Sequence, residues 1–199
     1  MSADTATSTD LSPLLRGYLD QLAAIRRDAA ELTDGITDAQ FAWRPEPGKW
    51  SIGQNVNHLT ITGRSYTDVL GPALADARAR GLADRGDFRP SLVGGFMARS
   101  MEPPPRLRLK APRIYRPADA GAALDRRREL AAWRALHDLV EERIRAAAGL
   151  DLRRIRVGSP VSALVKMNAG DALALVLAHE RRHLWQMRRV REHAGFPAG

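Results

Sequence analysis

Two histidines near the carboxyl end of the chain, His179 and His183, have the spacing that a shared metal ion requires. Residues four apart lie one turn apart on the same side of a helix, so both imidazoles can reach one ion. The apolar residues Val176 and Met187 lie on that side, which indicates that the pair faces the protein interior. The chain has no cysteine, so a transition metal must bind histidine nitrogen and carboxylate oxygen. The alternative is a pair of core-edge histidines that only form hydrogen bonds.

The pair also belongs to an H-E-x-x-H string with Glu180 in second position, the pattern of zinc peptidases in which glutamate is the general base. The rest of the peptidase pattern is absent, because Gln186 and Arg189 stand where extended forms have glycine and histidine. Glu192, the only later acidic side chain, faces away from the pair. Glu180 is turned about 100° from His179 on a helix, so we expect it to be exposed unless it acts as a base or as an outer partner of the metal site.

His58 is the candidate for the third ligand. It lies two turns into a helix that should begin with a capping box formed by Ser51 and Gln54, close to the apolar face of that helix. Three protein ligands and one open position are the pattern of a catalytic metal site. Three imidazoles suit zinc, nickel, iron or copper, and of these we expect zinc or nickel. His137 is predicted to pack in the core or support the site from outside, and His193 to be exposed.

Four long helices must position these ligands. Apolar periodicity and capping signals predict them over residues 12–35, 51–80, 118–148 and about 171–195. Residues 41–50 should form a turn and a loop, and residues 81–117 a long connection with a short helix over 92–99. The best strand candidate, a weak one, is 161–165. The sequence therefore predicts an all-α protein, a four-helix bundle in a single domain over 1–199, with residues 1–10 as a disordered lead-in.

The formal charge of +8 and the basic isoelectric point raise nucleic acid or an anionic membrane as partner. Lysine occurs only at Lys49, Lys110 and Lys166, and arginine makes up the rest of the 31 basic residues, a bias that a GC-rich genome produces without any ligand. We therefore expect no nucleic acid and no membrane as partner. The N-terminus lacks the features of a signal peptide, and no apolar run approaches roughly 20 residues, so we expect a cytoplasmic protein.

Three stretches together resemble the DinB/YfiT-like metalloprotein family: Trp43–Leu59, Lys110–Pro117 and His179–Gln186. The resemblance implies an up-down-down-up four-helix bundle with a long crossover between the second and third long helices. It also implies a homodimer and a divalent metal held by His58, His179 and His183, the same residues that the spacing selects. Trp43 and Trp50 match the loop before the second long helix, where we expect them to clasp the end of the bundle.

Members of that family include thiol-dependent transferases and isomerases. The resemblance thus implies a metal-dependent S-transferase or hydrolase that acts on a small electrophilic substrate, with a low-molecular-weight thiol as a cosubstrate of the transferase. Metal chemistry is compatible with this function. A metal ion with an open coordination position stabilises the anion of a bound thiol or water and so makes it a nucleophile near neutral pH. Arginines could hold carboxylates of such molecules, but the sequence does not choose among them. The alternatives are a non-catalytic metal-binding bundle that serves interaction or stress response, and a zinc peptidase with Glu180 as base.

Overall fold

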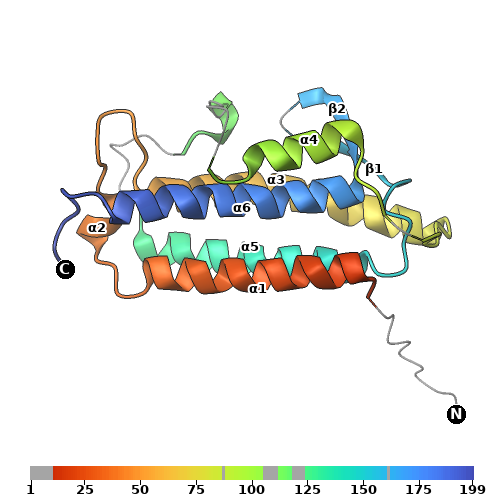
Figure 1. The fold of residues 1–199 in the computed structure, drawn as a ribbon, viewed down its shortest axis with the longest axis horizontal. Helices are drawn as coiled ribbons and strands as arrows, with labels where there is room; N and C mark the ends of the chain where they lie inside the picture. Colours follow the sequence, from red (N-terminus) through yellow and green to blue (C-terminus); the bar gives the residue numbers. More distant parts are fainter. Residues whose placement is uncertain (1–10, 87, 105–111, 118–123, 161) are drawn as a thin grey trace, which may run out of the picture.

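The described part of the protein contains four long helices, two shorter ones, a 3-10 turn and a small hairpin (Figure 1). The computed structural model describes residues 11–86, 88–104, 112–117, 124–160 and 162–199. The lead-in expected over 1–10 lies outside these residues. The elements in chain order are α1 (Pro13–Thr33), α2 (Asp38–Ala42), α3 (Ile52–Ala79), α4 (Leu92–Met101), the 3-10 helix η1 (Arg113–Tyr115), α5 (Arg126–Ala146), β1 (Arg156–Ser159), β2 (Ser162–Asn168) and α6 (Ala169–Arg191).

The long helices have the up-down-down-up arrangement, which confirms the predicted fold. In Figure 1, α1 and α6 run in one direction and α3 and α5 in the other. Both α1 and α3 pack against α5 and α6, so α1 and α3 occupy opposite corners of the bundle. Since α3 and α5 are parallel neighbours, the chain must return along the bundle between them. This return is the crossover, residues 80–125, and it carries α4 and η1.

Local capping explains where most of the helices begin. The side chain of Ser12 accepts a hydrogen bond at the start of α1, and α2 and α3 each begin with a capping box. The box at α3 agrees with the prediction from the sequence. The short helix predicted in the crossover is also present as α4, with Ser91 as its N-cap. The bundle core consists of one apolar face from each long helix, including Leu22, Ile25, Leu59, Leu70, Leu136, Ile144, Leu173 and Leu177.

Two predicted elements differ from the structure. The third long helix was expected from residue 118, but α5 begins at Arg126, because Asp125 has an extended backbone and its carboxylate accepts the N–H of Arg128. The stretch 118–123 lies outside the described residues. Residues 162–165 of the weak strand candidate are part of β2, and residue 161 lies outside the described residues. The antiparallel partner β1 was not predicted, since Arg156 and Gly158 interrupt any apolar pattern there.

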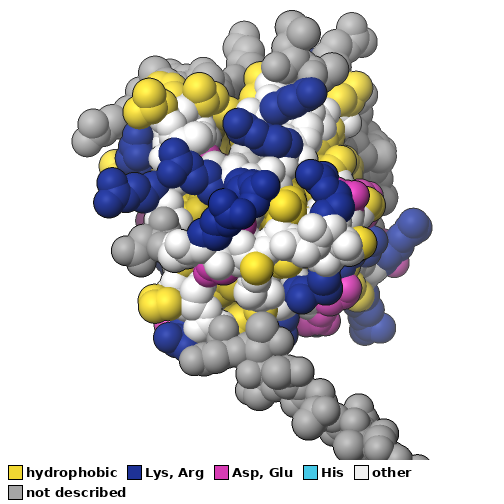
Figure 2. All heavy atoms as spheres, turned by 90° about the vertical axis from the view of Figure 1, so that its right-hand side faces the viewer, with side chains coloured by type: hydrophobic (Ala, Val, Ile, Leu, Met, Phe, Trp, Pro, Cys, Tyr) yellow, Lys and Arg dark blue, Asp and Glu magenta, His cyan; other side chains and the backbone are white. Residues whose placement is uncertain are grey.

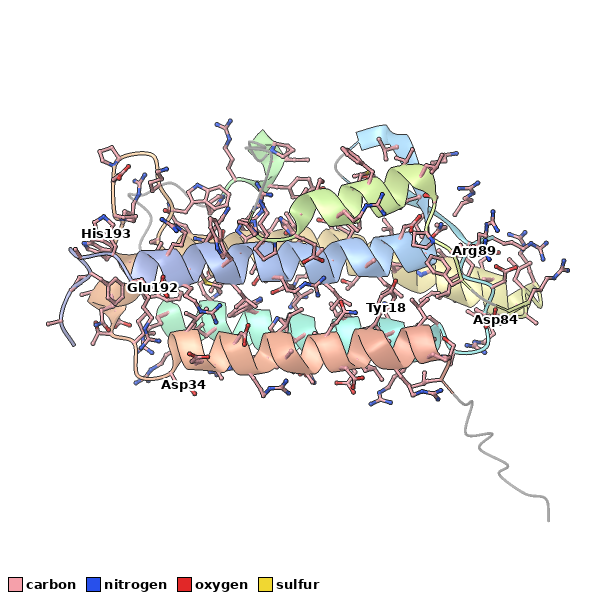
Figure 3. All side chains as sticks on the ribbon, viewed as in Figure 1. Tyr18, Asp34, Asp84, Arg89, Glu192 and His193 are labelled. Atoms are coloured by element: carbon pink, nitrogen blue, oxygen red, sulfur yellow. The ribbon has the colours of Figure 1, made fainter. Side chains whose placement is uncertain are left out.

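The crossover is attached to the bundle through α4, which packs against α6. Asp171 in the first turn of α6 accepts hydrogen bonds from the backbone N–H and the hydroxyl of Ser91, at 3.1 and 2.6 Å. A Cβ at Gly94 would overlap the Asp171 side chain, so the two helices approach closely here. Nearby, between α1 and α6, the hydroxyl of Tyr18 donates to the carbonyl of Gly170 at 3.1 Å (Figure 3).

Basic side chains gather on the end of the bundle at which α3 and α5 both finish (Figure 2). Arg78, near the end of α3, donates to the carbonyls of Ala146 and Ala148 at 2.8 and 3.0 Å, at the end of α5. Cations stabilise helix C-termini because the helix dipole is negative there. Arg78 thus has a structural role that needs no polyanionic partner, and the expected absence of nucleic-acid and membrane partners stays a prediction. No helix of the described part has the length and apolar character that crossing a bilayer requires.

Candidate metal centre

The structure brings His58 of α3 together with His179 and His183 of α6. The Nε2 atom of His179 lies 3.3 Å from that of His58 and 3.1 Å from that of His183. The three ligand atoms all lie within 4.8 Å of one another. Nitrogens that bind one tetrahedral ion at about 2.1 Å are separated by about 3.4 Å, so the observed spacing suits a shared ion.

The outer nitrogens of two rings are held by acceptors, which determines the tautomer. The Nδ1 atom of His58 is hydrogen-bonded to the backbone carbonyl of Tyr115, a group that can only accept. The Nδ1 atom of His183 lies 2.8 Å from Oδ1 of Asn55, whose amide nitrogen donates to the carbonyl of Ser51. Both Nδ1 atoms therefore carry the proton, and both Nε2 atoms direct a lone pair at the centre of the cluster.

These tautomers make the cluster unfavourable without a cation. His179 has one Nε2 atom and can place at most one proton between itself and a neighbour. Its contacts with His58 and His183 are both within 3.3 Å, so at least one of them would set lone pair against lone pair. A divalent ion in the middle removes that repulsion and uses all three lone pairs. The donor set therefore fits a metal through its own hydrogen bonding.

Burial keeps the three histidines in the neutral form that binds metal. Loss of solvation lowers the pKa of His58, although the contact with the Tyr115 carbonyl acts in the opposite direction. Burial, followed by the charges of His58 and Arg182, lowers the pKa of His179 to about 3. The pKa of His183 lies well below its ordinary value, again chiefly because of burial. None of the rings needs to release a proton at neutral pH before an ion binds.

A cavity of about 1220 Å³ opens above the three rings, and all three line it. Within the part of the chain that the structure describes, no fourth histidine or carboxylate joins the ligand cluster. The ring of Trp50 lies against the site, with its centroid 4.9 Å from that of His58 and 5.8 Å from that of His183. The fourth position of an ion held here would therefore face the cavity.

The two tryptophans of the loop before α3 have different roles. Trp43 clasps the end of the bundle as expected, with ring contacts to His193 and Phe196 at 5.4 and 5.5 Å. Trp50 does not share that role, since it covers the histidine rings and lines the cavity. His193 is exposed just beyond the end of α6, as predicted, where Figure 3 shows it.

Glu180 is buried rather than exposed, which corrects the expectation from the sequence. Only 2% of its surface is accessible, and its Oε2 atom accepts hydrogen bonds from Trp133 Nε1 at 3.0 Å and His137 Nε2 at 3.3 Å. The helix does turn Glu180 away from the direction of His179, but α5 and not solvent lies on that side. These contacts favour a role in attaching α6 to α5. His137 is a buried partner of this carboxylate, within the two roles predicted for it.

Sequence reasoning missed the two groups that orient the rings. Asn55 precedes His58 by three residues, a spacing that places two side chains on one helix face and could have identified it. The acceptor from Tyr115 is a backbone carbonyl, for which the residue type gives no signal. Only the path of the crossover places that carbonyl beside α3.

Replacing Asn55 by alanine should weaken metal binding by about 10- to 100-fold, the usual effect of losing an outer partner of a ligating histidine. The His183 ring then loses the acceptor that sets its tautomer and orientation. Competition with a chromophoric chelator measures the change. Asn57→Ala is the matched control, because the Asn57 amide donates to Glu129 and not to a ligand. Equal affinities of the two variants would contradict the assignment.

The chain belongs to the DinB superfamily, whose family model matches residues 21–187. Among solved structures, its fold is similar to that of YfiT from Bacillus subtilis, described as a probable metal-dependent hydrolase with an unusual four-helix bundle topology. The two chains share 15% sequence identity and superpose with a TM-score of 0.59, over 99% of this chain and 95% of that one. At this identity the likeness shows the fold. A comparison with curated proteins found no significant match.

Proposed function

We propose that this protein is a metal-dependent enzyme in which a thiol or a water molecule is activated to attack a small electrophilic substrate. The observation that carries the proposal is the set of three neutral imidazoles that share one centre and line a cavity, with no fourth histidine or carboxylate among the described side chains. Structural zinc sites are closed by four protein ligands, whereas catalytic sites keep one position open. The reaction would be an S-transfer when the nucleophile is a thiol, and a hydrolysis when it is water.

The ligands would be His58, His179 and His183, and the ion zinc or nickel, both of which bind neutral imidazole. Such an ion with an open position lowers the pKa of a bound thiol or water toward neutrality. The chain itself orients the ligands, through the Tyr115 carbonyl and the Asn55 amide. The description of YfiT supports the hydrolytic form, and the resemblance to thiol-dependent members of the family supports the transferase form.

The size of the cavity favours a small molecule as substrate. Small-molecule pockets usually enclose about 300–1,000 Å³, and this cavity is slightly larger. Trp50, Met97 and Met101 give it apolar walls that would exclude water from the reacting atoms. A peptidase is a weaker proposal, because the Glu180 carboxylate is buried and its Oε2 atom already accepts two hydrogen bonds from α5. The homodimer that the resemblance implies stays a prediction.

Two model reactions test the proposal on protein purified without a chelating tag and loaded with zinc or nickel. Hydrolysis is followed with p-nitrophenyl acetate, and S-transfer with cysteine and 1-chloro-2,4-dinitrobenzene. We expect the loaded protein to exceed the metal-free protein by about 100-fold in at least one reaction, the scale of a single catalytic group.

The His183→Ala variant at the same metal concentration is the control for adventitious catalysis by ions in solution. Stoichiometric metal in the wild type, with rates equal to those of the metal-free protein in both reactions, would contradict an enzyme. The non-catalytic bundle would then be the better description, and metal removal should lower its melting temperature.

A further inference from the structure

Charged side chains around the cavity are mainly cationic. The acidic ones are Glu46, which is exposed, and Glu180, which is hydrogen-bonded to α5. A cavity of low dielectric constant with an excess of one sign of charge concentrates ligands of the other sign. The basic side chains that line it are Lys49, Arg116, Arg182 and Arg189.

The arginines of α6 differ according to the side of the helix on which they lie. Arg188 does not line the cavity, and its guanidinium lies 3.7 Å from the carboxylate of Asp28. Arg189 does line the cavity, and its guanidinium carbon lies 5.3 Å from the centre of the Trp185 ring. Among the described residues, no carboxylate lies within ion-pair distance of Arg189 or Lys49. No carboxylate of the described part therefore neutralises either cation.

Arg182 adds a positive charge beside the three histidines. Only 6% of its surface is accessible, and it donates to the carbonyl of Ser100 at the end of α4, at 3.3 Å. Arg182 lines the cavity together with the three histidines, so its positive charge favours an anion in that part of the cavity.

Arg189 is offset from the histidines along the axis of α6. Arg189 follows His183 by six residues on α6, which corresponds to about 9 Å along the helix axis. Apolar side chains, including Trp50, Trp185 and Met97, line the cavity together with polar ones such as Thr62 and Gln186. A ligand that reaches from the metal centre to Arg189 could therefore place a partly apolar body between its two ends.

We infer that the substrate or the thiol cosubstrate of this site is a small organic anion, with a carboxylate or phosphate bound by Arg189 and Lys49 and its reacting atom at the three histidines. The placement of the reacting atom at the histidines rests on the proposed function, whereas the binding of the anion by Arg189 and Lys49 does not. Guanidinium and ammonium groups form charge-assisted hydrogen bonds with such anions, which are about twice as strong as neutral ones.

Two thiols of equal length test the inference on the cobalt-substituted protein, in which a bound thiolate gives a charge-transfer absorption. 6-Mercaptohexanoate carries a carboxylate at about the right distance, and 6-mercapto-1-hexanol is its neutral counterpart. We expect the wild type to bind the carboxylate about tenfold more tightly, the usual gain from a hydrogen bond to a charged group. The preference should decrease as ionic strength rises, because salt screens the exposed cations.

The double variant Arg189→Gln, Lys49→Gln should lose the preference and still bind the neutral thiol as the wild type does. Arg188→Gln is the matched control, a neighbouring arginine outside the cavity that should leave the preference intact. Equal affinity of the two thiols for the cobalt-loaded wild type would overturn the inference. If the cobalt-loaded wild type lacked the visible absorption of protein-bound cobalt, the result would instead contradict the proposed function.

A second measurement on the metal-free protein keeps the two proposals separate. Trp50 and Trp185 both line the cavity, so their fluorescence reports which quenchers enter it. Iodide should quench the wild type more strongly than the double variant, whereas neutral acrylamide should quench the two proteins equally. Identical iodide quenching in both would overturn the anion site whether or not the protein binds metal.

Discussion

Replacing His183 by alanine will abolish stoichiometric metal binding while the bundle stays folded. One of three ligands is lost, and apparent binding energies of such sites are of order 10 kcal/mol, so about 3 kcal/mol disappears, or about 100-fold in affinity. The metal content of dialysed protein, determined by mass spectrometry, should fall from about one ion per chain in the wild type to nearly none. Circular dichroism checks that the helices remain.

His193→Ala is the control for this experiment, because His193 is exposed at the end of α6 and does not belong to the cluster. It should retain the metal content of the wild type. Equal metal content in His183→Ala and the wild type, or none in either, would remove the basis of the metal centre. His179→Ala should behave like His183→Ala, since its Nε2 atom contacts both other rings.

Replacing Glu180 by alanine should lower the free energy of unfolding by about 3 kcal/mol. The change leaves the indole N–H of Trp133 and the ring of His137 without their buried acceptor, and each unsatisfied buried group costs about 1–3 kcal/mol. For a chain of this size the melting temperature should fall by about 6–12 °C, which calorimetry on the metal-free protein measures directly.

Glu192→Ala, on the exposed glutamate that caps the C-terminus of the same helix, is the control and should change stability by less than about 0.5 kcal/mol. The pair of variants also tests the peptidase alternative. A Glu180→Ala protein that melts like the wild type but loses all metal-dependent hydrolysis would assign Glu180 to catalysis and contradict the anchoring role.

The bundle could be predicted from the sequence because its signals are local. The start of α3 depends on Ser51 and Gln54, which cap the helix within one turn, and apolar periodicity does the rest. The spacing of His179 and His183 likewise places two rings together without reference to any other element. These features use neighbours along the chain, and a single sequence displays such neighbours directly.

The missed features depend on contacts between distant segments. Helical periodicity predicts the direction in which Glu180 points from α6. It does not predict that α5 lies on that side and supplies Trp133 and His137 as hydrogen-bond donors. The short hairpin likewise depends on pairing between β1 and β2, in which Arg156 lies opposite Asn168. Charge around the cavity could not be assigned either, because the sequence offers many arginines and only the fold separates those that face the site.

The hydrogen bond from His58 to the Tyr115 carbonyl makes two equilibria interdependent. An ion that binds His58 favours the conformation in which the segment around Tyr115 is docked on α3, and docking of that segment strengthens the ion's affinity by the same factor. The hydroxyl of Tyr115 extends this linkage to the hairpin, through its bond to the carbonyl of Pro160 at 2.8 Å. Metal binding at His58 and the placement of Tyr115 against α3 and the hairpin should therefore stabilise each other.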